Sequence, residues 1–238
     1  MKQLLVADLG IMPYAEALEL QRTVARDRIS GAISEDVLLL VEHPPVVTLG
    51  RSSKQKNLIS SPDFLKSRGV DLFEVERGGD VTFHGPGQLV GYPIIDLKRH
   101  KLDLHWYLRQ VEEAIIRTLS GYGISGERNT GYTGVWTQGK KIASIGVHAR
   151  DWVTWHGFAL NVVTDLSYFD FIVPCGIQDV EMTSIAKEIR LRGDEAPAAL
   201  RVDSVSEVAA KMFGEVFSVR PVVTPVTDLR SYLGTGIV

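Results

Sequence analysis

The stretch Gly139-Lys140-Lys141-Ile142-Ala143-Ser144-Ile145-Gly146-Val147 has the alternation of a β-strand. Because successive side chains of a strand point to opposite faces, Lys141 would share a face with Ala143, and Lys140 would point the other way with Ser144. Burial disfavours a charged ammonium, so a lysine on an apolar face is suited to proton transfer. The alternative is a structural lysine that extends its ammonium to water at a strand end.

Other stretches before and after residues 139–147 are rich in Val, Ile, Leu and aromatic residues and are bounded by Gly, Pro, Asn or Asp. They predict strands at residues 3–8, 36–42, 45–50, 72–77, 88–96, 132–137, 140–148 and 157–163. Apolar residues at helical spacing predict helices over 14–29, over 104–119 with Asp103 as the cap, and from Ser204 onward. Strands and helices interleave without strict alternation, which favours an α+β fold with a mixed sheet flanked by helices.

The composition is that of an ordinary globular protein, with 238 residues, 45% of them hydrophobic and 23% charged. This length can bury one substantial core, so we expect a single domain over residues 1–238. The stretch 191–203 is the best candidate for an exposed loop, and 204–238 could form a C-terminal helical appendage.

A net charge of −3 provides no broad basic field for nucleic acid or an anionic membrane. Two local basic clusters remain. One consists of Arg51, Lys54 and Lys56, and the other of Lys98, Arg99 and Lys101. Each is either solvated surface or a docking site for an acidic partner. A single cysteine excludes an internal disulfide, and the longest aliphatic run, 37–41, is far below the roughly 20 residues that span a bilayer. We expect a cytoplasmic protein, or the mature form of an organelle protein.

A glycine-rich stretch, Arg77-Gly78-Gly79-Asp80-Val81-Thr82-Phe83-His84-Gly85-Pro86-Gly87-Gln88, bends sharply and lets a ligand approach the backbone. It is neither a phosphate loop nor a dinucleotide-binding turn. A structural hairpin is the alternative, although its Arg, Asp, Thr and His are more polar groups than a turn requires. The stretch 156–162, His-Gly-Phe-Ala-Leu-Asn-Val, is a weaker candidate for a ligand-facing strand.

The only cysteine lies in Ile172-Val173-Pro174-Cys175-Gly176. A lone cysteine is usually a small buried hydrophobe. Here a proline precedes it and a glycine follows, and the amide after a nucleophile is a common oxyanion donor. One cysteine and six scattered histidines provide no zinc-ligand pair, so we expect no metal site.

Together with His43-Pro44-Pro45-Val46-Val47-Thr48-Leu49-Gly50-Arg51, these stretches resemble the lipoyl(octanoyl) transferase family, from about residue 43 to 184. The resemblance implies the fold of biotin and lipoate protein ligases. It also implies transfer of an octanoyl group from acyl carrier protein to a lysine of lipoyl domains. The acceptors would be lipoyl domains of 2-oxoacid dehydrogenase complexes and the glycine cleavage H protein, and neither ATP nor a metal would be needed.

The resemblance also implies roles for individual residues. Cys175 would be the acyl-thioester nucleophile, and Lys141, 34 positions earlier, the residue that lowers its pKa. The residues implied to line the acyl substrate are Arg77, Gly78, Gly79, Asp80, Val81, Thr82, Phe83, His84, Ser144, Ile145, Gly146, Gly157, Phe158 and Ala159. We expect Phe83 and Phe158 to form the chain pocket, and His84 to orient a group or contact the acyl carbonyl, with a role as base left open.

Two alternatives remain. An ATP-dependent lipoate or biotin ligase would need a lysine but no cysteine nucleophile; Cys175 and the absence of a GRGRxG-type loop count against it. A non-catalytic carrier of an acyl chain or cofactor would tolerate Lys141→Ala and Cys175→Ser.

Overall fold

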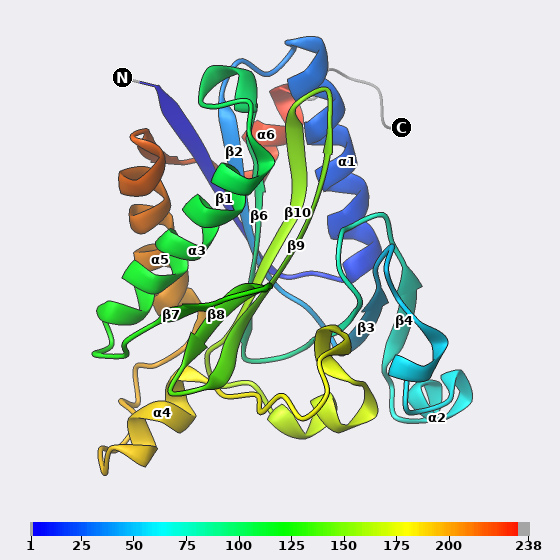
Figure 1. Ribbon diagram of the computed structural model, residues 1–238. Coiled ribbons are helices and arrows are strands. Elements are labelled where there is room, and N and C mark those ends of the chain that lie inside the picture. The colour runs from blue at the N-terminus through cyan, green and yellow to red at the C-terminus, as the bar shows by residue number, and fades with distance from the viewer. Residues whose placement is uncertain (1, 233–238) are drawn as a thin grey trace.

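The computed structural model describes the backbone of residues 2–232 and the side chains of residues 2–229. Within this range eight strands form one mixed sheet in the order β11-β1-β2-β6-β10-β9-β8-β7 (Figure 1). Their bounds are β1 (Gln3–Ile11), β2 (Asp36–Glu42), β6 (Gln88–Ile94), β7 (Glu127–Asn129), β8 (Tyr132–Thr137), β9 (Lys140–Arg150), β10 (Val153–Asn161) and β11 (Arg220–Val223). Strand β1 is parallel to both neighbours, and the other pairs are antiparallel.

A second, three-stranded sheet lies beside the large one (Figure 1). Its order is β4 (Asp71–Glu74), β3 (Val46–Leu49) and β5 (Val81–His84), and α2 (Pro62–Ser67) accompanies it. The segment that contains the short 3₁₀ helix Leu166–Phe171 packs against this sheet through its own apolar cluster. The small sheet therefore brings the glycine-rich stretch toward the segment that carries Cys175.

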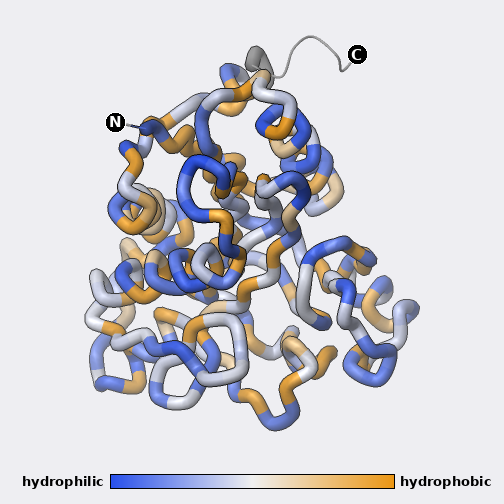
Figure 2. Tube along the Cα trace, turned by 45° about the horizontal axis from the view of Figure 1, so that its top comes forward, coloured by the Kyte–Doolittle hydropathy of each residue, from blue (hydrophilic) through white to orange (hydrophobic). Residues whose placement is uncertain are grey.

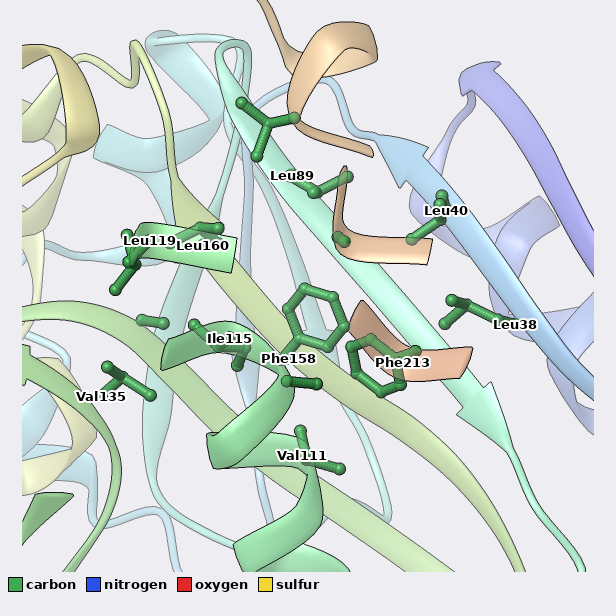
Figure 3. Packing of buried hydrophobic residues seen from close by; sticks show 14 of the residues in the cluster. Leu38, Leu40, Leu89, Val111, Ile115, Leu119, Val135, Phe158, Leu160 and Phe213 are labelled. Carbon is green, nitrogen blue, oxygen red and sulfur yellow. The ribbon is translucent and has the colours of Figure 1, made fainter. Parts of the chain in front are cut away.

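Helices cover both faces of the large sheet. On one face α3 (Leu104–Ser120) and α5 (Val202–Phe217) bury the main core, where the rings of Phe158 and Phe213 stack at 5.3 Å (Figure 3). On the other face α1 (Tyr14–Ser30) and α6 (Val226–Tyr232) cover a second cluster. The helices in Figure 2 carry both hydrophilic and hydrophobic residues, as elements with one buried face do.

The predicted α+β fold is confirmed, and each predicted strand is present with ends shifted by a few residues. Strands β5, β7 and β11 were not predicted, because they have three or four residues each and show too little alternation to stand out. The start of α5 was predicted two residues late. Ser204 lies inside the first turn, where its hydroxyl accepts a hydrogen bond from the backbone N–H of Arg201 at 3.2 Å.

The C-terminal part of the described chain belongs to the main core. Phe213 and Phe217 of α5 are buried there with residues of α3 and β10, and β11 extends the large sheet next to β1. We propose on this ground that the chain forms a single domain without a separate appendage; residues 233–238 lie outside the described residues. No helix in the described part of the chain is long and apolar enough to cross a membrane. Short α4 (Ile185–Leu191) begins at Ser184, whose hydroxyl caps it.

Candidate active site

Lys141 and Cys175 meet at the end of the large sheet. The Lys141 Nζ atom donates a hydrogen bond to the Cys175 Sγ atom at 3.0 Å, although 34 positions separate the two residues. Lys141 is only 1% exposed, and its ammonium also lies 4.9 Å from the ring centre of Trp136. Cys175 is partly exposed as a residue and lines a cavity, whereas its partner Lys141 is shielded from water.

A β-bulge in β9 directs Lys141 toward the thiol. Val135 of β8 pairs with Ala143, whereas the next residue, Trp136, pairs with Lys141, so Ile142 is the extra residue. Ile142 and Ala143 both enter the main core, and Lys141 and Ser144 both reach Cys175. The uninterrupted alternation expected from the sequence, with Lys141 and Ser144 on opposite faces, is therefore wrong at this point.

The segment that follows Cys175 fixes the backbone of Lys141. The Lys141 N–H donates to the Glu181 carbonyl at 2.8 Å, and the Thr183 N–H donates to the Lys141 carbonyl at 2.9 Å. Asn161 at the end of β10 donates its side-chain amide to the Thr183 carbonyl at 2.9 Å. The lysine and the cysteine are thus held by one continuous stretch of chain.

The turn that carries Cys175 is held in an unusual backbone conformation. Cys175 has φ 55° and ψ 18°, in the left-handed region that few non-glycine residues adopt. A Cβ atom at Gly176 would lie 2.6 Å from the Asp80 carboxylate, so only glycine allows this approach. Asn57 donates its side-chain amide to the same carboxylate at 2.6 Å and accepts the Val173 N–H at 2.8 Å. Asn57 and Asp80 therefore hold the turn from one side.

The surroundings of Cys175 act on its thiol in opposite directions. Burial raises the pKa of the Cys175 thiol, but the adjacent Lys141 charge, hydrogen bonds from Lys141 and Ser144, and the Arg77 charge together hold this pKa below its ordinary value. Thiolate is the nucleophilic form of cysteine. The site therefore favours a reactive Cys175 at neutral pH.

A narrow, partly open cavity has Cys175 in its wall. It is lined by Tyr14, Arg77, Thr82, His84, Val90, Tyr92, Ser144, Ile145, Gly146, His156, Gly157, Phe158, Ala159 and Cys175. A Cβ atom at Gly157 would lie 2.1 Å from the Gly91 carbonyl, so this glycine allows β6 to pass close by. The three predicted segments around residues 77–84, 144–146 and 157–159 thus converge on one cavity.

Not every residue of those segments faces the cavity. Along β5, Thr82 and His84 line it, whereas Val81 and Phe83 turn into the core of the small sheet, where Phe83 stacks on Tyr168 at 4.7 Å. The expectation that Phe83 forms part of the chain pocket is therefore corrected, because side chains alternate along a strand. Gly78, Gly79 and Asp80 lie in the loop behind the wall; Gly78 donates its N–H to the Val147 carbonyl at 2.8 Å.

The cavity wall is more polar than the sequence suggested. Tyr14 and Tyr92 line it and were not predicted, because they lie on separate elements and no local pattern marks them; His156, the first residue of the stretch 156–162, lines it as well. His43 lies behind them and shares a hydrogen bond of 2.7 Å with the Tyr92 hydroxyl. Burial raises the pKa of Tyr14 to about 12 and lowers the pKa of His43 to about 4. Both side chains are therefore neutral at neutral pH.

His84 is buried and neutral as well. Burial and the nearby His43 lower the pKa of His84 to about 3, while its Nδ1 atom pairs with the Gln88 side chain at 2.9 Å. A general base is most effective when its pKa lies near the working pH. A role as general base, left open by the sequence, is therefore unsuited to His84, and a neutral orienting role fits it.

Arg77 provides a fixed positive charge in the cavity wall. Its guanidinium is 7% exposed and donates three hydrogen bonds to the carbonyl and hydroxyl of Thr48, at 2.7 to 3.3 Å. Within the described residues no carboxylate forms an ion pair with it. An unneutralised buried cation stabilises negative charge that develops nearby.

The amide after Cys175 is already engaged. The Gly176 N–H donates to the Val173 carbonyl at 2.9 Å, which closes the turn. The expectation that this amide holds an oxyanion is therefore wrong for the conformation described. In contrast, the Thr82 hydroxyl lines the cavity, is buried, and has no hydrogen-bond partner among the described residues. Among residues 2–232 no group of three or more His, Cys, Asp and Glu side chains is arranged to hold a metal ion.

The arrangement of strands and helices is the fold of the lipoate-protein ligases. A lipoate-protein ligase A solved with bound ATP superposes with a TM-score of 0.78 over 98% of this chain and 92% of that one, at 16% identity. An archaeal lipoate protein ligase from Thermoplasma acidophilum, studied with its E2 lipoyl domain, gives a TM-score of 0.71 at 18% identity, over 98% and 91% of the two chains. These similarities establish the fold.

Sequence comparison then identifies the family. Residues 13–214 match the lipoyl protein ligase A/B catalytic domain, and the chain belongs to this family. An octanoyltransferase from Acidobacterium capsulatum is 52% identical over 222 residues, covering 88% of each chain. Octanoyltransferases from Rubrobacter xylanophilus (55% over 192 residues, 80% of this chain and 84% of that one) and Nostoc punctiforme (48% over 219 residues, 90% and 89%) are similarly close.

Proposed function

We propose that this protein is an octanoyltransferase that moves an octanoyl group from acyl carrier protein to a specific lysine of lipoyl domains. The observation that carries the proposal is the 3.0 Å contact between Lys141 Nζ and Cys175 Sγ at the mouth of the cavity. Relatives at about half identity that are named octanoyltransferases support the acyl group, and the family supports the lipoyl-domain acceptor.

The first half-reaction transfers the acyl group to the enzyme. Lys141 takes the thiol proton, and the resulting Cys175 thiolate attacks the carbonyl carbon of the octanoyl thioester. The new carbon–sulfur bond forms as the bond to the phosphopantetheine sulfur breaks. The Lys141 ammonium returns its proton to that leaving sulfur, so the lysine is neutral when the acyl-enzyme is complete.

The second half-reaction uses the same pair in reverse. Neutral Lys141 accepts a proton from the incoming amine of the target lysine as that amine attacks the Cys175 thioester. An amide bond forms, and Cys175 leaves as a thiolate beside the Lys141 ammonium, which restores the ammonium–thiolate pair that attacks the next donor. Neither ATP nor a metal ion enters either step.

The cavity suits an acyl chain whose carbonyl lies near Cys175. Val90, Ile145 and Phe158 provide apolar wall, and each buried methylene contributes about 0.8 kcal/mol to binding. The unpartnered Thr82 hydroxyl can donate to the acyl carbonyl, and Arg77 stabilises the oxyanion of the tetrahedral intermediate through its charge. We assign these two side chains the stabilising role first expected of the Gly176 amide.

The acceptors in this proposal are lipoyl domains of 2-oxoacid dehydrogenase complexes and the glycine cleavage H protein, in the cytoplasm. The structural neighbour from Thermoplasma acidophilum, which was studied together with an E2 lipoyl domain, supports an acceptor of this kind. Acyl carrier protein, as the donor, is the partner that supplies the phosphopantetheine arm.

An ATP-dependent ligase is the second candidate, because the fold is shared with a ligase that binds ATP. Intact-mass analysis after incubation with octanoyl–acyl carrier protein, without ATP, separates the two. We expect a gain of one octanoyl group in the wild type and none in Cys175→Ser. Undiminished transfer by Cys175→Ser, or transfer only from free octanoate with ATP, would overturn the proposal.

A further inference from the structure

The two basic clusters of the chain differ in how their charges are neutralised. In the cluster at residues 98–101, each cation has a carboxylate partner. Lys98 pairs with Asp96 at 4.0 Å, Arg99 with Glu35 at 3.5 Å and Lys101 with Asp103 at 3.2 Å. This cluster is therefore a locally neutral surface and attracts no acidic partner.

The cluster of Arg51, Lys54 and Lys56 is not neutralised. All three residues are exposed, on the loop between β3 and α2. Within the part of the chain that the structure describes, none of their side chains has an ion-pair or hydrogen-bond partner. We call residues 51–56 the basic loop.

Both ends of the basic loop are attached to the active site. At its start, the Arg51 N–H donates to the Arg77 carbonyl at 3.0 Å, and the Ser52 N–H donates to the Gly79 carbonyl at 3.1 Å. Just after its end, Asn57 accepts the Val173 N–H at 2.8 Å and contacts Asp80 beside Gly176. The basic loop is therefore joined by hydrogen bonds at its start to the stretch that carries Arg77, and just after its end to the segment that carries Cys175.

We propose that the basic loop is the docking surface for the acyl carrier that donates the octanoyl group, which deepens the proposed function and rests on it. The donor brings its thioester on an arm with a phosphodiester, which is an anion and is complementary to the unpaired cations of the basic loop. The acceptor presents a lysine ammonium, which the same cations repel. Charge therefore assigns this surface to the donor.

Exposed cations of this kind act mainly on encounter. They raise the association rate and the local concentration of an anionic partner, and salt screens their effect with a Debye length of about 8 Å at physiological ionic strength. Their removal should therefore raise the KM for the carrier-bound donor and leave the chemical step intact.

The test compares two charge reversals of the same size. Lys54→Glu/Lys56→Glu alters the basic loop. Lys211→Glu/Arg220→Glu is the matched control, because both residues are exposed, carry no side-chain partner within the described residues, and lie on α5 and β11. Each variant is assayed with octanoyl–acyl carrier protein and with octanoyl-pantetheine, a protein-free donor that lacks the phosphate.

We expect kcat/KM for the carrier-bound donor to fall about tenfold or more in the basic-loop variant at low salt, and less than about twofold in the control. With octanoyl-pantetheine the basic-loop variant should stay within about twofold of wild type. High salt should raise the wild-type KM for the carrier and reduce the difference between the variants.

Three outcomes would overturn the docking assignment: an unchanged KM for the carrier, an equal loss with both donors, or a rise in the KM for the lipoyl domain instead. Wild-type enzyme that transfers octanoyl from neither donor would overturn the proposed function itself. The two failures are thereby distinguished.

Discussion

Two adjacent lysines on β9 occupy opposite environments. Lys141 is 1% exposed and contacts the Cys175 sulfur at 3.0 Å, whereas the Lys140 side chain is 20% exposed and pairs with Glu188 at 3.5 Å. Lys141 has no carboxylate partner among the described residues, while Lys140 is neutralised. The same residue type thus contacts the Cys175 sulfur in one position, where we propose a catalytic role, and forms an ion pair in the next.

The difference shows that a local irregularity, and not residue type, decides which lysine serves the site. The bulge at Ile142 places Lys141 and Ser144 together on the Cys175 side. Ile142 and Ala143 meanwhile remain in the main core. The following predictions test this division between the two faces.

The largest expected effect is that of Lys141→Met. The long apolar side chain fills the site but removes the proton acceptor and the charge that stabilises the thiolate. We expect the rate of acyl-enzyme formation to fall by about 10²–10⁴, measured by rapid-quench mass analysis. Lys140→Met is the matched control and should stay within about threefold of wild type. Equal losses in both variants would contradict the distinction between the two lysines.

The same variant should change the pH dependence of the thiol. In the wild type the pKa of Cys175 lies below its ordinary value because the Lys141 charge, the hydrogen bonds from Lys141 and Ser144, and the Arg77 charge together outweigh burial. Without Lys141 burial is opposed only by Ser144 and Arg77, so the pKa rises, and the alkylation rate of Cys175 by iodoacetamide should rise at higher pH in Lys141→Met than in wild type. Superimposable pH profiles would contradict this account, and Lys140→Met should reproduce the wild-type profile.

A smaller loss of activity is expected when the turn that carries Cys175 is weakened. Asn57→Ala removes the amide that holds the Asp80 carboxylate beside Gly176, so the turn loses part of its support. Because small misplacements of reacting groups are costly, kcat/KM should fall about tenfold or more. The pH midpoint of Cys175 alkylation should also move upward, because the thiol lies farther from the Lys141 ammonium in this variant.

A purely structural role for Asn57 would lower the melting temperature without moving that midpoint. Asn129→Ala, at an exposed position in β7, is the control and should change neither quantity. If Asn57→Ala lowers kcat/KM by less than about twofold, the turn keeps its conformation without the Asn57 amide, which contradicts this prediction.

The smallest effect belongs to Ser144. Its hydroxyl lies 3.7 Å from the Cys175 sulfur and contributes one weak hydrogen bond. Ser144→Ala should lower kcat/KM by about two- to fivefold, as expected for about 0.5–1 kcal/mol. A loss as large as that of Lys141→Met would give the hydroxyl a place in proton transfer that the geometry does not suggest.

Much of this arrangement could be predicted from sequence. The strands with strong alternation and the apolar stripe of α3 with its Asp103 cap could be predicted because they depend on local sequence. The segments around Lys141 and Cys175 could also be named, because these stretches resemble those of the lipoyl(octanoyl) transferase family; the residues alone left a structural lysine and a buried thiol as alternatives.

Other features depend on contacts between distant segments. The bulge at Ile142 is fixed by pairing with β8, and the sequence pattern of residues 139–147 does not indicate it. Tyr14, Tyr92 and His156 meet only after α1, β6 and β10 assemble, and Asn57 gains its role only where it meets Asp80. The neutralisation of one basic cluster and not the other is likewise invisible until the carboxylates are placed.

The most direct test of the central claim is a chase of isolated acyl-enzyme. Enzyme carrying octanoyl on Cys175 is freed of donor and mixed with an unmodified lipoyl domain without ATP, and both proteins are followed by mass. The account predicts that octanoyl leaves the enzyme at the rate at which it appears on the lipoyl domain, fast enough to support steady-state turnover. Acyl-enzyme that persists while turnover proceeds from fresh donor would contradict it.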